Sequence, residues 1–251
     1  MDDVQGKRVL VTGASSGIGA AVAQLFARKG ACVGVHYAHN RSGAEEVLAA
    51  IRAQQGEAVL LQCDLLQVEE RSRLVEQFVA RYGGVDVLVN NAGAAISFQD
   101  FRQITQEEWW QAMALNAEAP LWLSRLVWSY MAQNHWGRII NISTAAVKFG
   151  GSPNGVHYVA AKAALEGITM ALAKAGAASN ILVNAIRCGI IDTGIYKKLP
   201  GYTQEQFIQR GKKAFLGRAG TTDEVAGWVL FLASSAAGYT TGELISVAGG
   251  D

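Results

Sequence analysis

The amino-acid sequence predicts an α/β fold in which one parallel sheet is covered by helices on both faces. The main observation is alternation: short apolar runs rich in Val, Ile and Leu are separated by segments long enough to form a helix. Such runs indicate strands that are buried on both faces, as in parallel sheets. Seven runs have this character, at residues 9–11, 32–35, 58–63, 85–89, 138–142, 181–186 and 244–247.

The second observation is the uniform composition of the 251 residues, of which 50% are hydrophobic and 17% are charged. This hydrophobic fraction is sufficient for one large core. No repeat and no linker rich in Pro, Gly or Ser divides the chain. We therefore expect a single domain over residues 1–251, of the doubly wound, Rossmann-like class.

Glycines mark the junction between the first predicted strand and the helix that follows it. Residues 12–19 read Thr-Gly-Ala-Ser-Ser-Gly-Ile-Gly. Glycine allows a tight turn and a close approach of the backbone to a pyrophosphate, while the helix amino terminus supplies free N–H groups. The expected dinucleotide contacts are Gly13, Ser15, Ser16, Gly17, Ile18 and Gly19.

A tyrosine and a lysine four residues apart, Tyr158 and Lys162, fall on the same face of a predicted helix. A nearby positive charge favours the phenolate, so we expect the pKa of Tyr158 to lie below its usual value of about 10. Such a tyrosine can exchange a proton with a substrate oxygen. The pair predicts acid–base chemistry on an alcohol or carbonyl, although the spacing alone also fits a solvated helix face.

Five segments, taken in order, resemble the short-chain dehydrogenase/reductase family, including its 3-oxoacyl-carrier-protein reductases. They are the Thr-Gly-x-x-x-Gly-x-Gly pattern at residues 12–19, the Asn-Asn-Ala-Gly at 90–93, Asn116, the Tyr158/Lys162 pair, and Gly189 with Thr193. The resemblance covers essentially the whole chain and implies seven strands in the order 3-2-1-4-5-6-7. It also implies hydride transfer between a nicotinamide and a carbonyl or secondary alcohol.

The resemblance assigns roles to three side chains. Tyr158 would donate a proton to the carbonyl oxygen. Lys162 would lower the pKa of Tyr158 and hold the nicotinamide ribose. Asn116 would position, through its backbone, a water that joins Lys162 to solvent, unless it is a helix residue with a local hydrogen bond.

A fourth catalytic side chain departs from the family pattern. Family members usually carry a serine at the position that is Ala145 here. Counted from the end of the preceding strand, Thr144 takes the place of that serine if the next loop holds one inserted residue, and Ser143 is the alternative. Threonine keeps the hydroxyl, but its methyl group crowds the pocket.

The end of the second predicted strand bears on cofactor choice. NAD-binding members usually carry an acidic residue where this chain has Tyr37, and a carboxylate there would repel a 2′-phosphate. Arg41 can chelate a phosphate, unless it is a solvated loop charge. Further donors follow from His39, Asn40 and Ser42. NADP(H) is therefore favoured over NAD(H).

Other features of the cofactor site are implied by the resemblance. Ser16 weakens the case for NADP(H), because many NADP-preferring relatives carry arginine there. Asp64 fits the position that contacts adenine, or it is a helix N-cap. Cys188 replaces a usual proline and is either a reactive thiol or an inert core residue. The remaining expected contacts are Leu65, Asn91, Ala92, Gly93, Gly189, Ile191 and Thr193.

Charge and cysteine content disfavour several functions. The net charge is +1 and no run of Lys or Arg is present, which argues against nucleic acid as a partner. Cys32, Cys63 and Cys188 lack metal-ligand spacing, so we expect no metal site and a reducing compartment. No apolar stretch approaches the roughly 20 residues of a membrane helix, and the amino terminus does not resemble a signal peptide. We expect a cytoplasmic protein.

Two segments predict features beyond the core. Residues 194–215 are too long for a simple connection, which favours a substrate lid over a helical insertion on the surface. Residues 119–131, with Trp122 and Trp128, are apolar around most of a helix. This helix is expected to pack on the sheet and on a symmetry mate in a homodimer or homotetramer, unless it is wholly buried within one chain.

These observations predict an NADP(H)-dependent carbonyl reductase or alcohol dehydrogenase. Candidate substrates are 3-oxoacyl thioesters, cyclic or aliphatic ketones, and sugars or polyols. A hydrophobic pocket is suggested by Phe149, Val156, Leu199 and Phe207, whereas Lys197 and Lys198 could attract a phosphate-bearing carrier. The alternative function is a non-catalytic dinucleotide-binding regulatory or scaffold protein, which the changes at Thr144 and Cys188 would fit.

Overall fold

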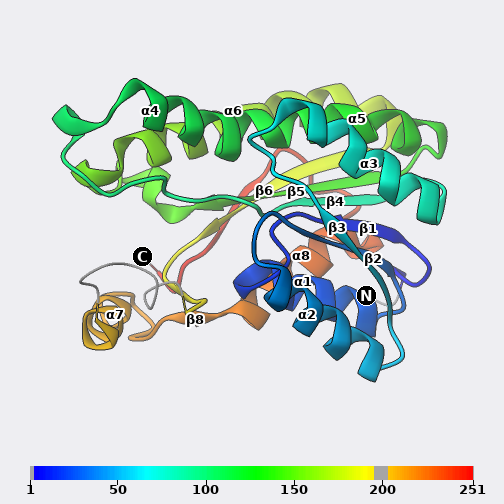
Figure 1. Cartoon of the computed structure of the whole chain (residues 1–251), viewed down its shortest axis with the longest axis horizontal. Coiled ribbons are helices and arrows are strands. Elements are labelled where there is room, and N and C mark those ends of the chain that lie inside the picture. The colour runs from blue at the N-terminus through cyan, green and yellow to red at the C-terminus, as the bar shows by residue number, and fades with distance from the viewer. Residues whose placement is uncertain (1–2, 195–202, 251) are drawn as a thin grey trace.

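The structure, a computed structural model, describes residues 3–194 and 203–250. Its main sheet has seven strands in the order β3-β2-β1-β4-β5-β6-β9, and all adjacent pairs are parallel (Figure 1). The predicted order is therefore confirmed, with β9 as the seventh strand. The strands are β1 (Arg8–Val11), β2 (Cys32–Tyr37), β3 (Glu57–Gln62), β4 (Val87–Asn90), β5 (Gly137–Thr144), β6 (Ile181–Cys188) and β9 (Leu244–Val247).

Helices cover both faces of this sheet (Figure 1). One layer contains α1 (Gly17–Arg28), α2 (Arg41–Ala53) and α8 (Thr222–Ala233). The other contains α3 (Val68–Tyr82), α4 (Gln106–Met113), α5 (Ala119–Gln133) and α6 (Val156–Gly176). This arrangement is the doubly wound Rossmann-like α/β fold that the alternation predicts.

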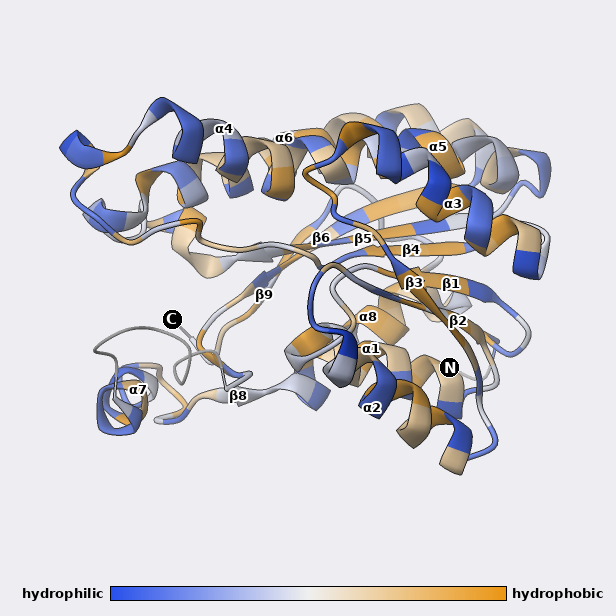
Figure 2. Ribbon diagram, viewed as in Figure 1, coloured by the Kyte–Doolittle hydropathy of each residue, from blue (hydrophilic) through white to orange (hydrophobic). Residues whose placement is uncertain are grey.

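Five strands, β1, β3, β4, β5 and β6, are hydrophobic along most of their length because they contribute to both cores (Figure 2). In β1, Val9 and Val11 belong to the core under α1 and α8, while Leu10 belongs to the core under α3 and α5. Successive side chains of a strand point to opposite faces, so a strand between two helical layers needs apolar residues at every position. This is the physical basis of the continuous apolar runs in the sequence.

Helix α5 is buried on one side only. Leu123, Val127 and Met131 are fully buried against the sheet, whereas the side chain of Trp122 is 38% exposed. The helix is therefore not wholly buried within one chain. Among the described residues, no helix has both the length and the apolar character needed to cross a membrane.

The segment expected to form a lid contains a helix and is flanked by the two strands of a small sheet that the sequence did not predict. Helix α7 (Gln204–Gly211) begins with a capping box between Thr203 and Gln206. Strands β7 (Ile191–Asp192) and β8 (Gly220–Thr221) pair in parallel on either side of this segment. Residues 195–202 of the expected lid, including Lys197, Lys198 and Leu199, lie outside the described residues.

Candidate active site

The glycine turn after β1 packs tightly against the end of β4. A side chain at Gly13 would come within 2.9 Å of the Ala92 Cα, and φ at Gly13 is +63°, a conformation that favours glycine. A Cβ at Gly19 would collide with the carbonyl oxygen of Gly13. Helix α1 can therefore start directly against the turn only because both positions lack a side chain.

The amino terminus of α1 has the properties of an anion site. Its N-cap residue, Ser16, makes no side-chain capping bond, and its first turn contains no acidic residue. The first amides of a helix have no partner within the helix and carry the positive end of its dipole. The residues at this turn fit the diphosphate of a dinucleotide.

Thr12 and Asn91 hold the turn and the β4 end together. The Thr12 Oγ1 accepts hydrogen bonds from the backbone amides of Asn91 and Ala92, both at 3.0 Å. The Asn91 Nδ2 donates to the carbonyls of Thr12 at 2.9 Å and Gly13 at 3.0 Å. Asn91 therefore acts here through support of the turn backbone.

A buried histidine, His36, also supports the glycine turn, and the sequence analysis missed it. The Gly13 amide donates to the His36 Nδ1 at 3.0 Å, so the ring proton resides on Nε2, which donates to the Cys63 carbonyl at 2.9 Å. Burial lowers the pKa of His36 to about 4. The sequence does contain a signal for this role: His36 is a lone polar residue inside an apolar strand, directly before Tyr37.

The loop after β2 carries the side chains expected at the adenosine end. Asn40 is the N-cap of α2 and its Nδ2 donates to the Ser15 carbonyl at 3.3 Å, which ties this loop to the glycine turn. The Arg41 Nε donates to the Glu45 carboxylate at 2.8 Å, and the side chain is 76% exposed. Tyr37 is buried, and the Ser42 hydroxyl donates to the Asn40 Oδ1 at 3.4 Å.

Asp64 lies beside this loop and is not a helix cap. Its Oδ1 accepts from the Leu66 amide at 3.0 Å, whereas α3 is preceded by Gln67 at the N-cap position. Its Oδ2 lies 4.0 Å from the Nε2 of His39, whose side chain is 84% exposed. The N-cap alternative for Asp64 is therefore wrong, because the helix starts further along the chain. Leu65, the next residue, is buried.

Gly93, shortly after β4, lies close to the side chains of Asn116 and Lys162. A Cβ at Gly93 would lie 2.7 Å from the Asn116 Oδ1 and 3.1 Å from the Lys162 Nζ. Asn116 lies in a π-helical turn, Ala114–Glu118, and its Nδ2 donates to the carbonyls of Ala94 and Ala112. The Asn116 Oδ1 is buried without a hydrogen-bond partner among the described residues. A bound water or hydroxyl group could supply the missing donor.

Tyr158 and Lys162 lie one turn apart on α6, as the spacing predicts, but the pKa of Tyr158 moves in the direction opposite to the expected one. Burial raises it to about 12, and the neighbouring Cys188 adds to this rise. The Lys162 Nζ lies 5.9 Å from the Tyr158 ring centroid and donates to the Ile142 carbonyl at 2.8 Å. Burial also lowers the pKa of Lys162 to about 8. Burial therefore determines the direction of both pKa shifts.

Ser143 and Thr144 occupy different environments at the end of β5. The Ser143 hydroxyl is buried and donates to the Glu166 carboxylate at 2.8 Å. Arg187 donates to the same carboxylate at 2.8 and 2.6 Å. The half-buried Thr144 lies opposite Cys188 in the sheet, and its Oγ1 accepts from the Ala146 amide at 3.2 Å. Of the two residues, only Ser143 donates a hydrogen bond to a carboxylate. The ion pair between Glu166 and Arg187 was not predicted from the sequence.

The segment after β6 returns to the glycine turn. A Cβ at Gly189 would lie 2.6 Å from the Ala248 Cα, and a Cβ at Gly17 would lie 3.2 Å from the Thr193 Cβ. Ile191 is buried in β7. Burial raises the pKa of Cys188 to about 12, so its thiol is protonated at neutral pH. This environment is that of an inert cysteine.

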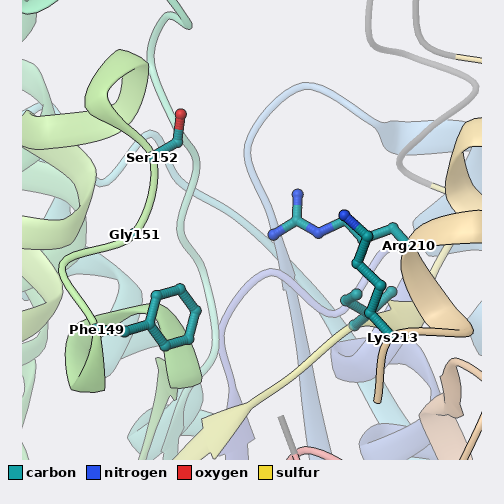
Figure 3. Close-up of a pocket in the computed structure, with 6 residues that line it drawn as sticks. Phe149, Gly151, Ser152, Arg210 and Lys213 are labelled. Atoms are coloured by element: carbon teal, nitrogen blue, oxygen red, sulfur yellow. The ribbon is translucent and has the colours of Figure 1, made fainter.

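A cavity of ≈ 370 Å³ opens beside these residues (Figure 3). Its lining combines the loop between Thr144 and Tyr158 with the residue after Gly189 and with the end of α7. The lining residues are Phe149, Gly151, Ser152, Ile190, Arg210 and Lys213. Phe149 thus lines a pocket as the sequence suggests, whereas Val156 and Phe207 are absent from its lining.

The fold and this edge of the sheet define a class of proteins, the NAD(P)-dependent oxidoreductases that act on a carbonyl or an alcohol. A family model described as enoyl-(acyl carrier protein) reductase matches residues 13–251. The chain belongs to the short-chain dehydrogenase/reductase family.

Several relatives and solved structures are similar over nearly the whole chain. The 3-oxoacyl-(acyl-carrier-protein) reductase FabG of Thermotoga maritima is 36% identical, covering 98% of both chains. FabG of Pseudomonas aeruginosa is 37% identical, also covering 98% of each. The structure of the angucycline C-6 ketoreductase LanV with bound NADP superposes with a TM-score of 0.89 at 32% identity, covering 98% of this chain and 96% of that one.

A mutant of a Serratia marcescens short-chain dehydrogenase/reductase also superposes with a TM-score of 0.89, at 30% identity and 98% coverage of both chains.

Proposed function

We propose that this oxidoreductase is an NADP(H)-dependent carbonyl reductase in which Tyr158 is the proton donor. The observation that carries the proposal is that Lys162 and Asn116 lie close to Gly93. Gly93 belongs to the segment after β4 that is also hydrogen-bonded to the glycine turn. A dinucleotide bound along this edge would supply or accept hydride at its nicotinamide. The residues of the chain would orient that ring and manage the proton.

The raised pKa of Tyr158 is compatible with this role. A phenol with a pKa of about 12 is protonated at neutral pH and can donate its proton to a carbonyl oxygen that gains negative charge. Lys162, with a pKa of about 8, is largely protonated at pH 7 and would stabilise the resulting phenolate. Asn116 would position a water beside Lys162 through its backbone, and its Oδ1, which has no partner among the described residues, would accept a further hydrogen bond.

Thr144, rather than Ser143, is proposed to hydrogen-bond the substrate oxygen. The Ser143 proton is directed to Glu166. The Thr144 Oγ1 accepts from a backbone amide, and no acceptor for its own proton is present among the described residues. Thr144 also lies in register with Cys188, next to the segment proposed to contact the nicotinamide, which comprises Gly189, Ile191 and Thr193.

NADP(H) rather than NAD(H) is supported by the loop after β2. No carboxylate stands at Tyr37, and Arg41 is exposed at the first position of α2. A 2′-phosphate would compete with Glu45 for the Arg41 guanidinium, and His39, Asn40 and Ser42 offer further donors. The LanV ketoreductase, which binds NADP, is a similar structure.

We also propose a substrate class, an oligomeric state and a cellular location for this protein. Relatives named 3-oxoacyl-(acyl-carrier-protein) reductases favour a 3-oxoacyl thioester or a related ketone. The exposed Trp122 on α5 supports a homodimer or homotetramer, and the three free cysteines favour a cytoplasmic location. Residues 203–215, which include α7, would form part of a lid over the substrate.

The test is oxidation of NADPH, with NADH in parallel, against carbonyl compounds that include an acetoacetyl thioester. We expect turnover with NADPH and loss of turnover in Tyr158→Phe, which keeps the ring but removes the donor. NADPH binding by the same variant, measured by fluorescence, separates loss of chemistry from loss of cofactor. Turnover that survives in Tyr158→Phe would refute the assignment of the proton donor.

A further inference from the structure

The cavity between Phe149 and Arg210 has two chemically different walls. Phe149, Gly151 and Ser152 belong to the loop that joins Thr144 to Tyr158, so this wall continues the catalytic edge of the sheet. A Cβ at Gly151 would touch the side chain of Val159, next to Tyr158. Phe149 is an exposed aromatic side chain. This wall offers an apolar surface close to the reacting groups.

The opposite wall is cationic. Arg210 in the last turn of α7 and Lys213 shortly after it lie across the cavity from Phe149 and Ser152 (Figure 3). The volume of ≈ 370 Å³ falls in the range of small-molecule sites. A substrate that enters this cavity would meet both cations on one side and Phe149 on the other.

These two cations have no carboxylate partner within the part of the chain that the structure describes. Nearby, Arg218 forms an ion pair with Glu224 at 2.6 Å, and Arg187 forms one with Glu166 at 2.6 Å. Both residues are solvent-exposed, so their charged groups are accessible to an anion that enters the cavity. A bound anion would relieve their mutual repulsion.

We propose that the substrate is a carbonyl compound with an anionic group, a carboxylate or phosphate, joined to the carbonyl by an apolar segment. Arg210 would bind the anion with its planar fork and Lys213 would add a second charge, while Phe149 would contact the apolar segment. The proposal rests on the carbonyl reductase activity proposed above and assigns substrate selection to the end of α7.

Matched substrates test the proposal with the intact protein. One pair is a keto acid and its methyl ester, and a second is an acetoacetyl thioester of phosphopantetheine and that of pantetheine. We expect kcat/KM to be about tenfold higher for the anionic member of at least one pair, equivalent to about 1.4 kcal/mol. The first pair reports a carboxylate and the second a phosphate. Equal kcat/KM within both pairs would overturn the proposal.

Variants then assign the selectivity to residues. Arg210→Gln and Lys213→Gln should each lower the anionic-to-neutral ratio of kcat/KM several-fold, mainly through KM. Lys212→Gln is the matched control, because Lys212 is exposed and adjacent but does not line the cavity. Arg210→Lys should recover part of the ratio. An unchanged ratio in both Gln variants, or an equal drop in Lys212→Gln, would refute the assignment.

Salt provides an independent measurement. Raising the ionic strength should increase KM for the anionic substrate and leave KM for the neutral one nearly constant. Failure of this proposal is distinguishable from failure of the proposed function. If the reductase activity is absent, neither member of a pair is reduced. If only the anion site is absent, both members are reduced equally and both reactions still require Tyr158.

Discussion

His36 makes the stability of this protein sensitive to mild acid. It is buried, its Nδ1 accepts from the Gly13 amide, and its Nε2 donates to the Cys63 carbonyl. A protonated ring would place an N–H against the N–H of Gly13, so protonation breaks the support of the glycine turn. Burial lowers the pKa of His36 from 6.5 to about 4, and the Gly13 amide is a further reason why the protonated ring is disfavoured.

The magnitude follows from the difference between the folded and unfolded pKa values. Above pH 6.5 the ring is neutral in both states and contributes no pH dependence. As the pH falls from 6.5 to about 4, the unfolded chain takes up a proton that the folded chain does not, so the folded state loses stability. At about 1.4 kcal/mol per pH unit, the loss from this group reaches about 3 kcal/mol.

The assay is urea denaturation across this pH window for the wild type, His36→Asn and His135→Asn. Asparagine can keep an acceptor near the Nδ1 position, but it is too short to keep the contact with the Cys63 carbonyl as well, so His36→Asn should be less stable at neutral pH. Because asparagine does not titrate, the variant should also lose part of the dependence of stability on pH. His135 is exposed and serves as the control. NADPH affinity measured in parallel should weaken for His36→Asn. A pH slope identical in His36→Asn and wild type would refute the reasoning.

Three further predictions concern the site. Thr144→Ala should lower turnover at least tenfold. Ser143→Ala should chiefly lower the free energy of unfolding, by about 1 kcal/mol, because only the hydrogen bond from Ser143 to Glu166 is lost. The reverse pattern in kinetics and denaturation would exchange the roles of the two residues. Arg41→Ala should raise KM for NADPH about tenfold and leave that for NADH unchanged, and an equal change for both would exclude contact with a 2′-phosphate. Glu166→Gln should reduce the free energy of unfolding by about 3 kcal/mol, since it leaves Arg187 without its partner, and a loss below about 1 kcal/mol in urea denaturation would contradict this.

Much of the fold could be predicted because its signals are local. The apolar runs correspond to strands that are buried on both faces, and the glycine pattern at residues 12–19 corresponds to a turn where a Cβ does not fit. The strand order came from the family resemblance. The small β7–β8 sheet was not predicted, since two residues per strand carry no periodicity.

The members of the proposed site could be named from the sequence, but their interactions could not. Tyr158 and Lys162 are neighbours on α6 because a helix repeats about every 3.6 residues. The sequence does not show how deeply the helix is buried, and burial determines the direction of the Tyr158 pKa. Likewise, the sequence offers both Ser143 and Thr144 as the hydroxyl that contacts the substrate. Successive side chains of β5 point to opposite faces of the sheet, and the packing of β5 on α6 directs Ser143 to Glu166.

The sequence by itself therefore determined the α/β class, the position of the glycine turn and the helical pairing of Tyr158 with Lys162. Each of these depends on residue spacing within one element or one turn. The tertiary structure decided the support of Gly13 by His36, the Ser143–Glu166–Arg187 contact and the meeting of Phe149 with Arg210 across a cavity. These depend on how separate elements pack, because residues distant in the chain come together only when the sheet and its helices assemble.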